Sequence, residues 1–315
     1  MQDSASYILT NYHVVYSPDD INQTKTCFTA CAYTYGSDEY PVKTTDYYDS
    51  QKRFPTYDWG KLGIELEYVV GSATLDLAIL KCDTATLLNR NRHAHPVQLA
   101  TNYAVGEEVF AIGNPNNEGL SMTKGVVSVK NEEILLNIGN SINSHPSIRT
   151  DASIYSGSSG GGLFNESGYL IGITNSGDSE NQNVNYAIPL EIVKNFVIRF
   201  LQTPNSYTPS KLVLGIAINT VNPSFQFSNN WNIYQDCIIA SIDKSSLAQR
   251  LDLQIGDIIK SITIDEIEFT INNIFDLTYA LMLPWAGSYI TLSILRDNLL
   301  NYSYTVKEAD LVRLD

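Results

Sequence analysis

Short apolar runs separated by turn residues dominate the chain from residue 7 to about residue 188. Runs rich in Val, Ile, Tyr and Phe are punctuated by Gly, Asn, Pro and Asp, for example at residues 65–70, 108–112, 125–129 and 170–173. Runs of this length and spacing are typical of an all-β barrel or sandwich. We therefore expect this part of the chain to fold from short strands, beginning with residues 7–10.

A helical pattern follows Pro189. Apolar side chains then recur every three or four positions, at Ile192, Val193, Phe196, Val197, Phe200 and Leu201. This spacing predicts an amphipathic helix, and proline suits its first turn. The polar face is only weakly basic, so we expect the helix to close the barrel rather than lie on a membrane.

The polar segment after this helix holds two prolines and divides the chain. A length of 315 residues suits two domains. We expect one domain at residues 1–202, a linker at 203–211 and a second domain at 212–315. The second domain shows strands, a short helix pattern at 246–251 and a longer one at 274–283. The polar stretch 34–59 reads as a surface loop or hairpin insertion.

Composition narrows the classes of protein. Hydrophobic residues make up 43% of the chain, enough for a buried core. The net charge of −14 argues against binding to nucleic acid or to anionic membranes, both of which need a basic face. No apolar run reaches the ~20 residues of a transmembrane helix. The polar start lacks the basic and apolar regions of a signal peptide.

The four cysteines do not indicate a disulfide framework. Cys27 and Cys31 lie four positions apart on one predicted strand, about 13 Å from each other. A disulfide needs Cα atoms within about 7 Å, so these two are not expected to bond. Cys82 and Cys237 are interpreted as small buried residues. The pair His93 and His95 has no further clustered ligands, and we predict neither a metal nor a cofactor.

Three separate segments carry residues that suit nucleophilic catalysis. His13 directly follows a predicted strand. Asp76 heads an apolar strand, where an unpaired charge would be costly, so it needs a donor such as a histidine N–H. Ser159 lies in a glycine-rich loop, whose backbone N–H groups can converge on one point. Asp151, in the same segment, is expected to bond within its loop.

These residue types match the needs of a serine nucleophile. A hydroxyl is a poor nucleophile until an imidazole takes its proton, and a carboxylate holds and stabilises that imidazole. Backbone N–H groups must meet the oxyanion as it forms. The chain order His13, Asp76, Ser159 is the chymotrypsin-like order.

The segments together resemble the HtrA/DegP family of trypsin-like serine proteases. That family has TNxHVV around its histidine, DLAxLK around its aspartate and NSGGPL around its serine. The corresponding runs in this chain lie at residues 10–15, 76–81 and 157–163. Four further family runs occur in the family's order: VGE at 105–107, AIGNP at 111–115, GVVS at 125–128 and AIP at 187–189. The resemblance covers nearly the whole chain and implies a double β-barrel of the trypsin class.

The resemblance assigns roles residue by residue. Ser159 would be the nucleophile, His13 the general base and acid, and Asp76 the orienting carboxylate. The N–H groups of Gly157 and Ser159 would form the oxyanion hole. Ser153 falls at the base of the S1 pocket, and because it is not an acid, small or aliphatic substrate side chains are expected there.

The second domain resembles the PDZ domain of the same family. Leu214, Gly215 and Ile216 are similar to the loop that captures a peptide's terminal carboxylate, while an extended peptide adds to the sheet edge. The helix at 274–283 would form the other wall of the groove. The alternative is a small α+β domain that only packs on the protease.

The chain also departs from the family. Ser158 and Gly162 replace the usual Asn and Pro, and the extra glycine is expected to loosen the oxyanion loop. Only six residues, 1–6, precede the first predicted strand. The first barrel is therefore expected to lack one or two strands, which would leave an unpaired edge. In the family, trimer contacts often come from that region. The oligomeric state of this chain therefore stays open, and a homo-oligomer is one of the alternatives.

Two functional readings therefore remain. The first is an endopeptidase that cleaves unfolded or damaged polypeptides through an acyl-enzyme and binds peptide C-termini at its PDZ domain. The second is a catalytically impaired, protease-like protein that binds peptides without cleaving them. The resemblance implies work outside the cytoplasm, in the periplasm or at a membrane.

Overall fold

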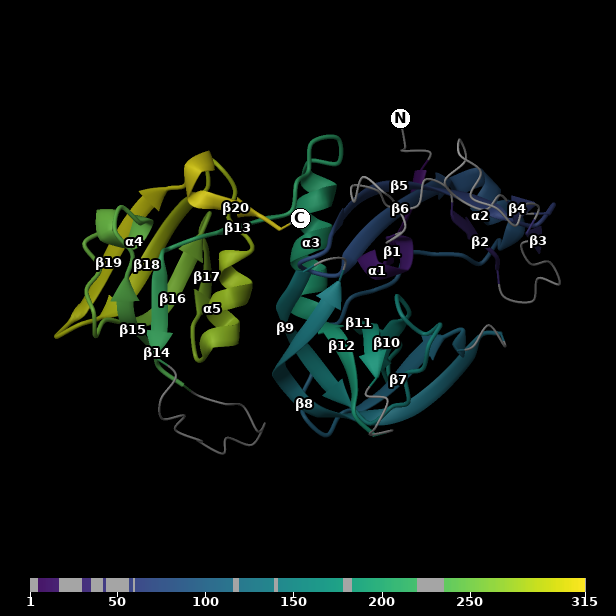
Figure 1. Cartoon of the computed structure of the whole chain (residues 1–315), viewed down its shortest axis with the longest axis horizontal. Coiled ribbons are helices and arrows are strands. Elements are labelled where there is room, and N and C mark those ends of the chain that lie inside the picture. The colour runs from purple at the N-terminus through teal and green to yellow at the C-terminus, as the bar shows by residue number, and fades with distance from the viewer. Residues whose placement is uncertain are drawn as a thin grey trace.

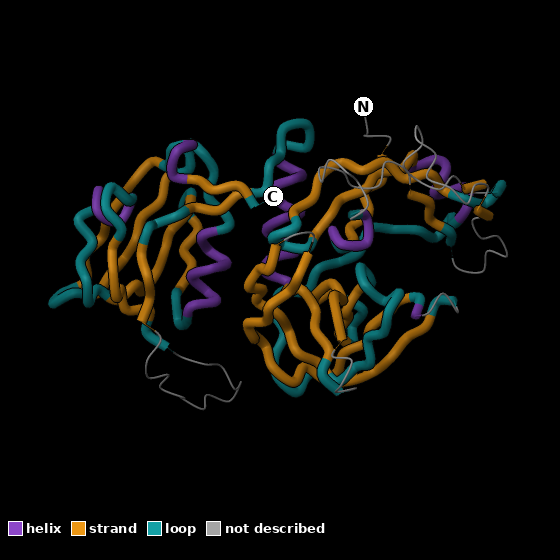
Figure 2. Tube along the Cα trace, in the orientation of Figure 1, coloured by secondary structure: helices purple, strands orange, loops and turns teal. Residues whose placement is uncertain are grey.

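A computed structural model describes residues 5–16, 30–34, 42–43, 57–58, 60–115, 119–138, 141–177, 183–219 and 235–314. The N-terminal unit holds a β-sheet, a β-barrel and the helix α3, and the C-terminal unit is a smaller sheet with two short helices (Figure 1). Strands account for most of the regular structure (Figure 2). The expected mostly β architecture is therefore confirmed.

The first sheet carries the histidine and aspartate segments. Its antiparallel order is β1–β6–β5–β2. The bounds are β1 Ala5–Thr10, β2 Ala30–Ala32, β5 Ile64–Ser72 and β6 Leu77–Asp83, with helices α1 Tyr12–Val15 and α2 Thr84–Arg90 and a ribbon of β3 Val42–Lys43 and β4 Tyr57–Asp58. Within the described residues this sheet is open, with β1 and β2 at its edges.

The second β structure is a closed barrel of six strands. Its order is β10–β11–β12–β9–β8–β7. The bounds are β7 Glu108–Gly113, β8 Ser121–Ile138, β9 Ser141–Thr150, β10 Gly162–Asn165, β11 Leu170–Gly177 and β12 Asn185–Pro189. Its core includes Val109, Val127, Ile148, Leu163 and Ile171, none of them exposed. The serine loop runs into β10, so the barrel sets the position of Ser159.

Helix α3 (Leu190–Gln202) begins directly after β12, with Pro189 at its N-cap position. Ile192, Val193, Phe196 and Phe200 are at most 1% exposed. They pack in one apolar cluster with residues of β6 and β11. The predicted amphipathic helix is confirmed. Most of its apolar stripe is buried inside the protein, while Leu201 near its end is 57% exposed.

The C-terminal unit is a sheet with β14 at one edge. Its order is β14–β15–β16–β18–β19, with β17 paired to β16. The bounds are β14 Ile216–Asn219, β15 Cys237–Ile242, β16 Ile258–Ile264, β17 Ile267–Thr270, β18 Tyr289–Leu295 and β19 Leu299–Thr305, with helices α4 Leu247–Arg250 and α5 Ile274–Leu281 and the short helix η2 Glu308–Asp310. A separate ribbon pairs β13 (Ser210–Leu212) with β20 (Leu311–Arg313).

The two units are in direct contact through α5. The Tyr279 hydroxyl donates to Asn131 Oδ1 at 2.7 Å, and Asn195 Nδ2 donates to the Tyr279 carbonyl at 3.1 Å. The Arg199 guanidinium lies 4.1 Å from the centre of the Trp285 ring. Tyr279 is 6% exposed and belongs to the same apolar cluster as α3. The C-terminal unit is thus packed on α3 by apolar and polar contacts together.

The structure bears on the expected linker, the expected insertion, the cysteines and membrane-spanning helices. Strand β13 begins at Ser210, inside the segment expected to be the linker. Most of the insertion expected at 34–59, and Cys27, lie outside the described residues. Cys31 is a free thiol, and so are the buried Cys82 and Cys237. Among the helices of the described residues, none is long and apolar enough to cross a membrane.

Candidate active site

His13 lies in a one-turn helix, α1, immediately after β1. Asn11, between the two elements, is fully buried, and its side-chain Nδ2 donates to the Asp76 carbonyl at 3.0 Å. This bond ties the start of α1 to the turn that precedes β6. The His13 side chain is 37% exposed, so one face of its ring meets solvent.

Asp76 holds His13 by two contacts. The His13 backbone N–H donates to Oδ1 at 2.9 Å, and Nδ1 of the ring lies 2.8 Å from Oδ2. Asp76 is 0% exposed and adopts a φ of 50°, in the left-handed region that non-glycine residues rarely occupy. A buried carboxylate in this position directs Nδ1 toward itself and leaves Nε2 for a substrate or nucleophile.

Asn175, in β11, is a third partner of this pair that the sequence did not single out. Its side-chain Nδ2 donates to Asp76 Oδ2 at 2.7 Å, and the residue is 4% exposed. Its backbone carbonyl accepts the hydroxyl of Ser159 at 2.9 Å. Asn175 lies 99 positions after Asp76 in the sequence, and it connects the carboxylate to the serine. Nothing in the local pattern of β11 marks it, since its role depends on long-range contacts alone.

Ser159 is thus close to the pair through Asn175, with its hydroxyl directed at the Asn175 carbonyl rather than at His13. The loop itself is held by backbone bonds. Gly160 N–H donates to the Thr174 carbonyl at 2.9 Å, and Ser158 N–H to the Tyr155 carbonyl at 2.9 Å. By contrast, the N–H groups of Gly157 and Ser159 have no acceptor among the described residues. Two unbonded donors two positions apart can receive a developing oxyanion.

The glycines of this loop are required by close packing. A Cβ on Gly160 would lie 2.1 Å from Thr10 Oγ1 at the end of β1, and Gly160 also has a φ of +81°. A Cβ on Gly161 would lie 2.1 Å from the Ile112 carbonyl in β7. These two glycines therefore let the loop pack closely against β1 and β7. The extra glycine, Gly162, is the first residue of β10, and the expectation that it loosens the loop stays a prediction.

The neighbouring polar residues surround the base of the expected S1 pocket. Ser153 is half-buried, and its carbonyl accepts the Thr123 hydroxyl at 2.7 Å. The buried Asn185 side chain accepts the Ile154 N–H at 3.1 Å. Asp151 was expected to bond within its own loop, but it accepts the Val126 N–H of β8 at 2.7 Å. Its carboxylate therefore joins the loop to the barrel wall.

A second histidine, His145, lies in β9 and is 1% exposed. Neither ring nitrogen has a hydrogen-bond partner among the described residues. Burial lowers the pKa of the His145 imidazole, while the charge of Asp76 and the nearby backbone, including that of Thr74 and Leu75, opposes this shift only in part. His145 is therefore a neutral, buried imidazole close enough to Asp76 to sense its charge.

In the C-terminal unit, Leu214 is 2% exposed and Gly215 has a φ of +70°. The carbonyls of Leu214 and Gly215 accept backbone N–H groups of Ala248 and Asp243. Their own N–H groups have no acceptor among the described residues. Ile216 begins β14, the edge strand of the sheet. Free donors beside an open strand edge are what a peptide's terminal carboxylate needs.

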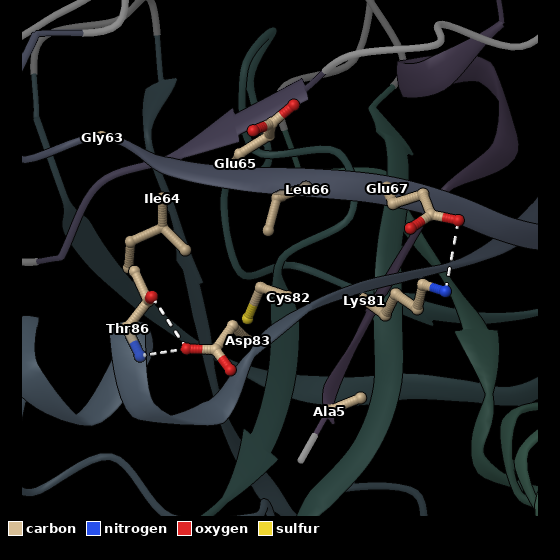
Figure 3. Close-up of a pocket in the computed structure, with 10 residues that line it drawn as sticks. All are labelled: Ala5, Gly63, Ile64, Glu65, Leu66, Glu67, Lys81, Cys82, Asp83 and Thr86. Atoms are coloured by element: carbon tan, nitrogen blue, oxygen red, sulfur yellow. Dashed lines mark hydrogen bonds and ion pairs between the residues drawn. The ribbon is translucent and has the colours of Figure 1, made fainter.

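A hollow of about 690 Å³ lies over the first sheet, away from His13 and Ser159. Its lining includes the Lys81–Glu67 ion pair at 3.2 Å and the Asp83 carboxylate, which caps α2 (Figure 3). Burial raises the pKa of the Cys82 thiol at this hollow, so the thiol stays protonated. The lining of this hollow includes none of His13, Asp76 and Ser159.

Comparisons with known proteins agree with this geometry. A family profile described as trypsin-like peptidase domain matches residues 2–173. The serine endoprotease DegS of Haemophilus influenzae is 31% identical over 201 residues, 61% of this chain and 52% of the relative. The periplasmic serine endoprotease DegP of Escherichia coli is 30% identical over 197 residues, 61% of this chain and 39% of the relative. The chain spans about half, or less, of the length of these relatives.

Solved structures extend the likeness to both units. The HtrA-type protease AlgW with tripeptide matches with a TM-score of 0.58 at 22% identity, over 98% of this chain and 87% of that one. The fold and the family profile together define the class, which is that of trypsin-like peptidase domains. Within that class, the chain belongs to the HtrA family.

Proposed function

We propose that this chain is an HtrA-type serine endopeptidase that hydrolyses unfolded or damaged polypeptides, with Ser159, His13 and Asp76 as its triad. The observation that carries the proposal is the two-point contact between His13 and the buried Asp76, 2.9 Å at the backbone and 2.8 Å at the ring. The names of the relatives support a serine endoprotease, and two of those relatives are named as periplasmic.

The reaction would be acyl transfer in two halves. Ser159 Oγ attacks the substrate carbonyl carbon as its proton passes to His13 Nε2, and the N–H groups of Gly157 and Ser159 receive the oxyanion. His13 then protonates the leaving amine, and water releases the acyl group by the same steps in reverse. Before attack, the Ser159 hydroxyl must exchange its bond to the Asn175 carbonyl for one to His13. An uncharged Ser153 suits a small or aliphatic substrate side chain.

The rival reading, a protein that binds peptides without cleaving them, is favoured by that same Ser159–Asn175 bond. A fluorophosphonate probe, which labels only an activated serine, separates the two. We expect labelling of the wild type and cleavage of an unfolded casein, and loss of both in Ser159→Ala and His13→Ala. Ser167→Ala, in an exposed turn, is the matched control. A folded wild type that is never labelled supports the binding protein.

The C-terminal unit would bind peptide C-termini. The unbonded N–H groups of Leu214 and Gly215 would take the terminal carboxylate, and the peptide would extend β14. Fluorescence anisotropy with a peptide that ends in an apolar residue tests this. We expect amidation of its C-terminus to weaken binding at least about tenfold, since it removes the charge that the loop receives. Equal binding of acid and amide would leave the alternative of a unit that only packs on the protease.

A further inference from the structure

The turn that presents Asp76 to His13 needs support from its surroundings. Asp76 has a φ of 50°, an unfavourable conformation for a residue with a side chain, which persists only where neighbouring contacts enforce it. The turn provides one bond of its own, from the Asp76 N–H to the Ala73 carbonyl at 3.3 Å. Asn11 provides a second. Further support for the backbone of the turn comes from Ser72, the last residue of β5.

Ser72 joins the turn to the C-terminal end of the described chain. Its hydroxyl accepts the Leu75 N–H at 3.1 Å and donates to the carbonyl of Leu314, 242 positions away. Ser72 is 0% exposed, so water does not replace either bond. The Ser72 hydroxyl is thus both a donor and an acceptor. Each of its two hydrogen bonds orients the hydroxyl favourably for the second one.

Leu314 is held in place independently of Ser72. Its backbone N–H donates to the Pro209 carbonyl at 2.8 Å, and it follows β20 directly. Figure 1 shows β13 and β20 running side by side from the C-terminal unit toward α3. The Leu314 side chain is 3% exposed and packs in the apolar cluster that also contains Leu75. The C-terminal unit therefore reaches the Asp76 turn by a hydrogen bond and by apolar packing.

We propose that Ser72 and Leu314 are positioning residues for Asp76, and that the chain after β20 thereby takes part in building the active site. We call this pair the Ser72–Leu314 clasp. Its role in catalysis rests on the proposed function, since it acts through the Asp76–His13 contact. A loosened clasp would let the turn relax from its left-handed conformation and turn the carboxylate away from the ring.

The experiment uses the full chain with Ser72→Ala, Leu314→Ala and their double variant. Val312→Ala, two residues earlier and 51% exposed, is the control, and Leu314→Met keeps the buried volume. Two readouts are taken well below the unfolding temperature of each variant. One is kcat and KM on a peptide substrate. The other is the low-field proton NMR signal of His13 Nδ1–H, identified by its loss in His13→Ala, which does not depend on turnover.

We expect Ser72→Ala and Leu314→Ala each to lower kcat at least about fivefold with little change in KM, and to shift or broaden the His13 signal. Both substitutions act through the Asp76–His13 contact. The loss of kcat in the double variant should therefore be much smaller than the product of the two single losses. Leu314→Met and Val312→Ala should match the wild type. Folded single variants with an unchanged His13 signal and kcat overturn the clasp. A wild type that shows the signal but no turnover refutes the proposed function instead, and the signal in the variants still decides the clasp.

Discussion

Asn175→Ala tests the part of the site that sequence patterns did not reveal. The substitution removes the amide that donates to Asp76 Oδ2 at 2.7 Å, and it leaves the backbone carbonyl that accepts the Ser159 hydroxyl. Asp76 is 0% exposed, so water does not replace the lost donor. The carboxylate would keep both of its contacts to His13 but lose the group that orients Oδ2 from the opposite side.

The size of the effect follows from the kind of bond. A hydrogen bond to a charged group contributes about 1.5–3 kcal/mol. If the whole of it were lost in the transition state, kcat/KM would fall about 10-fold to 150-fold, at about 1.4 kcal/mol per factor of ten. Part of the free energy of this hydrogen bond is already present before the transition state. We therefore expect kcat/KM to fall about 10-fold, the lower limit of that range. The free energy of unfolding should fall by a similar amount, about 2 kcal/mol.

The assay separates the hydrogen bond from the space it fills. Asn175→Ala leaves a small cavity, whereas Asn175→Leu keeps the branched shape and the number of heavy atoms of the side chain but has no donor. If the amide donor is what matters, the two variants should lower kcat/KM about equally. The free energy of unfolding of each variant is measured in urea. If Asn175→Leu retains wild-type kcat/KM while Asp76→Ala is inactive, the reasoning about Asn175 is wrong.

Two further predictions concern pH and backbone conformation. Burial lowers the pKa of His145, so its contribution to stability is complete above the pKa of an unfolded histidine, about 6.5, and is lost as the pH falls toward the lower folded value. His145→Gln should therefore lose less stability than the wild type between pH 7.5 and 5, measured by urea unfolding, and equal losses would contradict this. Gly160→Ala should abolish fluorophosphonate labelling and cost more than the ~1–2 kcal/mol of a left-handed alanine, because its Cβ meets Thr10. Gly168→Ala, with a similar φ of +77° and nothing within 4 Å, should show the backbone cost alone and keep its labelling.

The sequence predicts best where the signal is local and periodic. The spacing after Pro189 predicts α3, and the alternation of apolar runs and turns predicts β5, β7 and β11. The motifs also point to His13 and Asp76 before any coordinates, because each follows or heads a strand in a recognisable run. Yet His13 lies in a short helix rather than simply after a strand, since four residues are too few to show helical periodicity.

What the sequence does not predict depends on contacts between distant positions. Asn175 is one polar residue in a buried strand, and only the folded chain brings its amide to Asp76. The left-handed φ of Asp76 leaves no mark in the sequence either, because aspartate occurs in many turns of other kinds. The close approach of Thr10 to Gly160 and of the Ile112 carbonyl to Gly161 also leaves no local mark, because both neighbours are distant in the sequence.

The same contacts explain why the two units cannot be treated as independent modules. An inter-domain contact made only of exposed polar groups would permit relative motion. Here Tyr279 of α5 is buried in the cluster formed by α3, and its hydroxyl bonds to Asn131 of the barrel. Leu314 enters that same cluster from β20 and bonds to Ser72. The wall of the proposed peptide groove and the support of Asp76 thus share one apolar core. A substitution in that core should therefore disturb peptide binding and catalysis together, whereas one at an exposed position of β19, such as Leu299, should disturb neither.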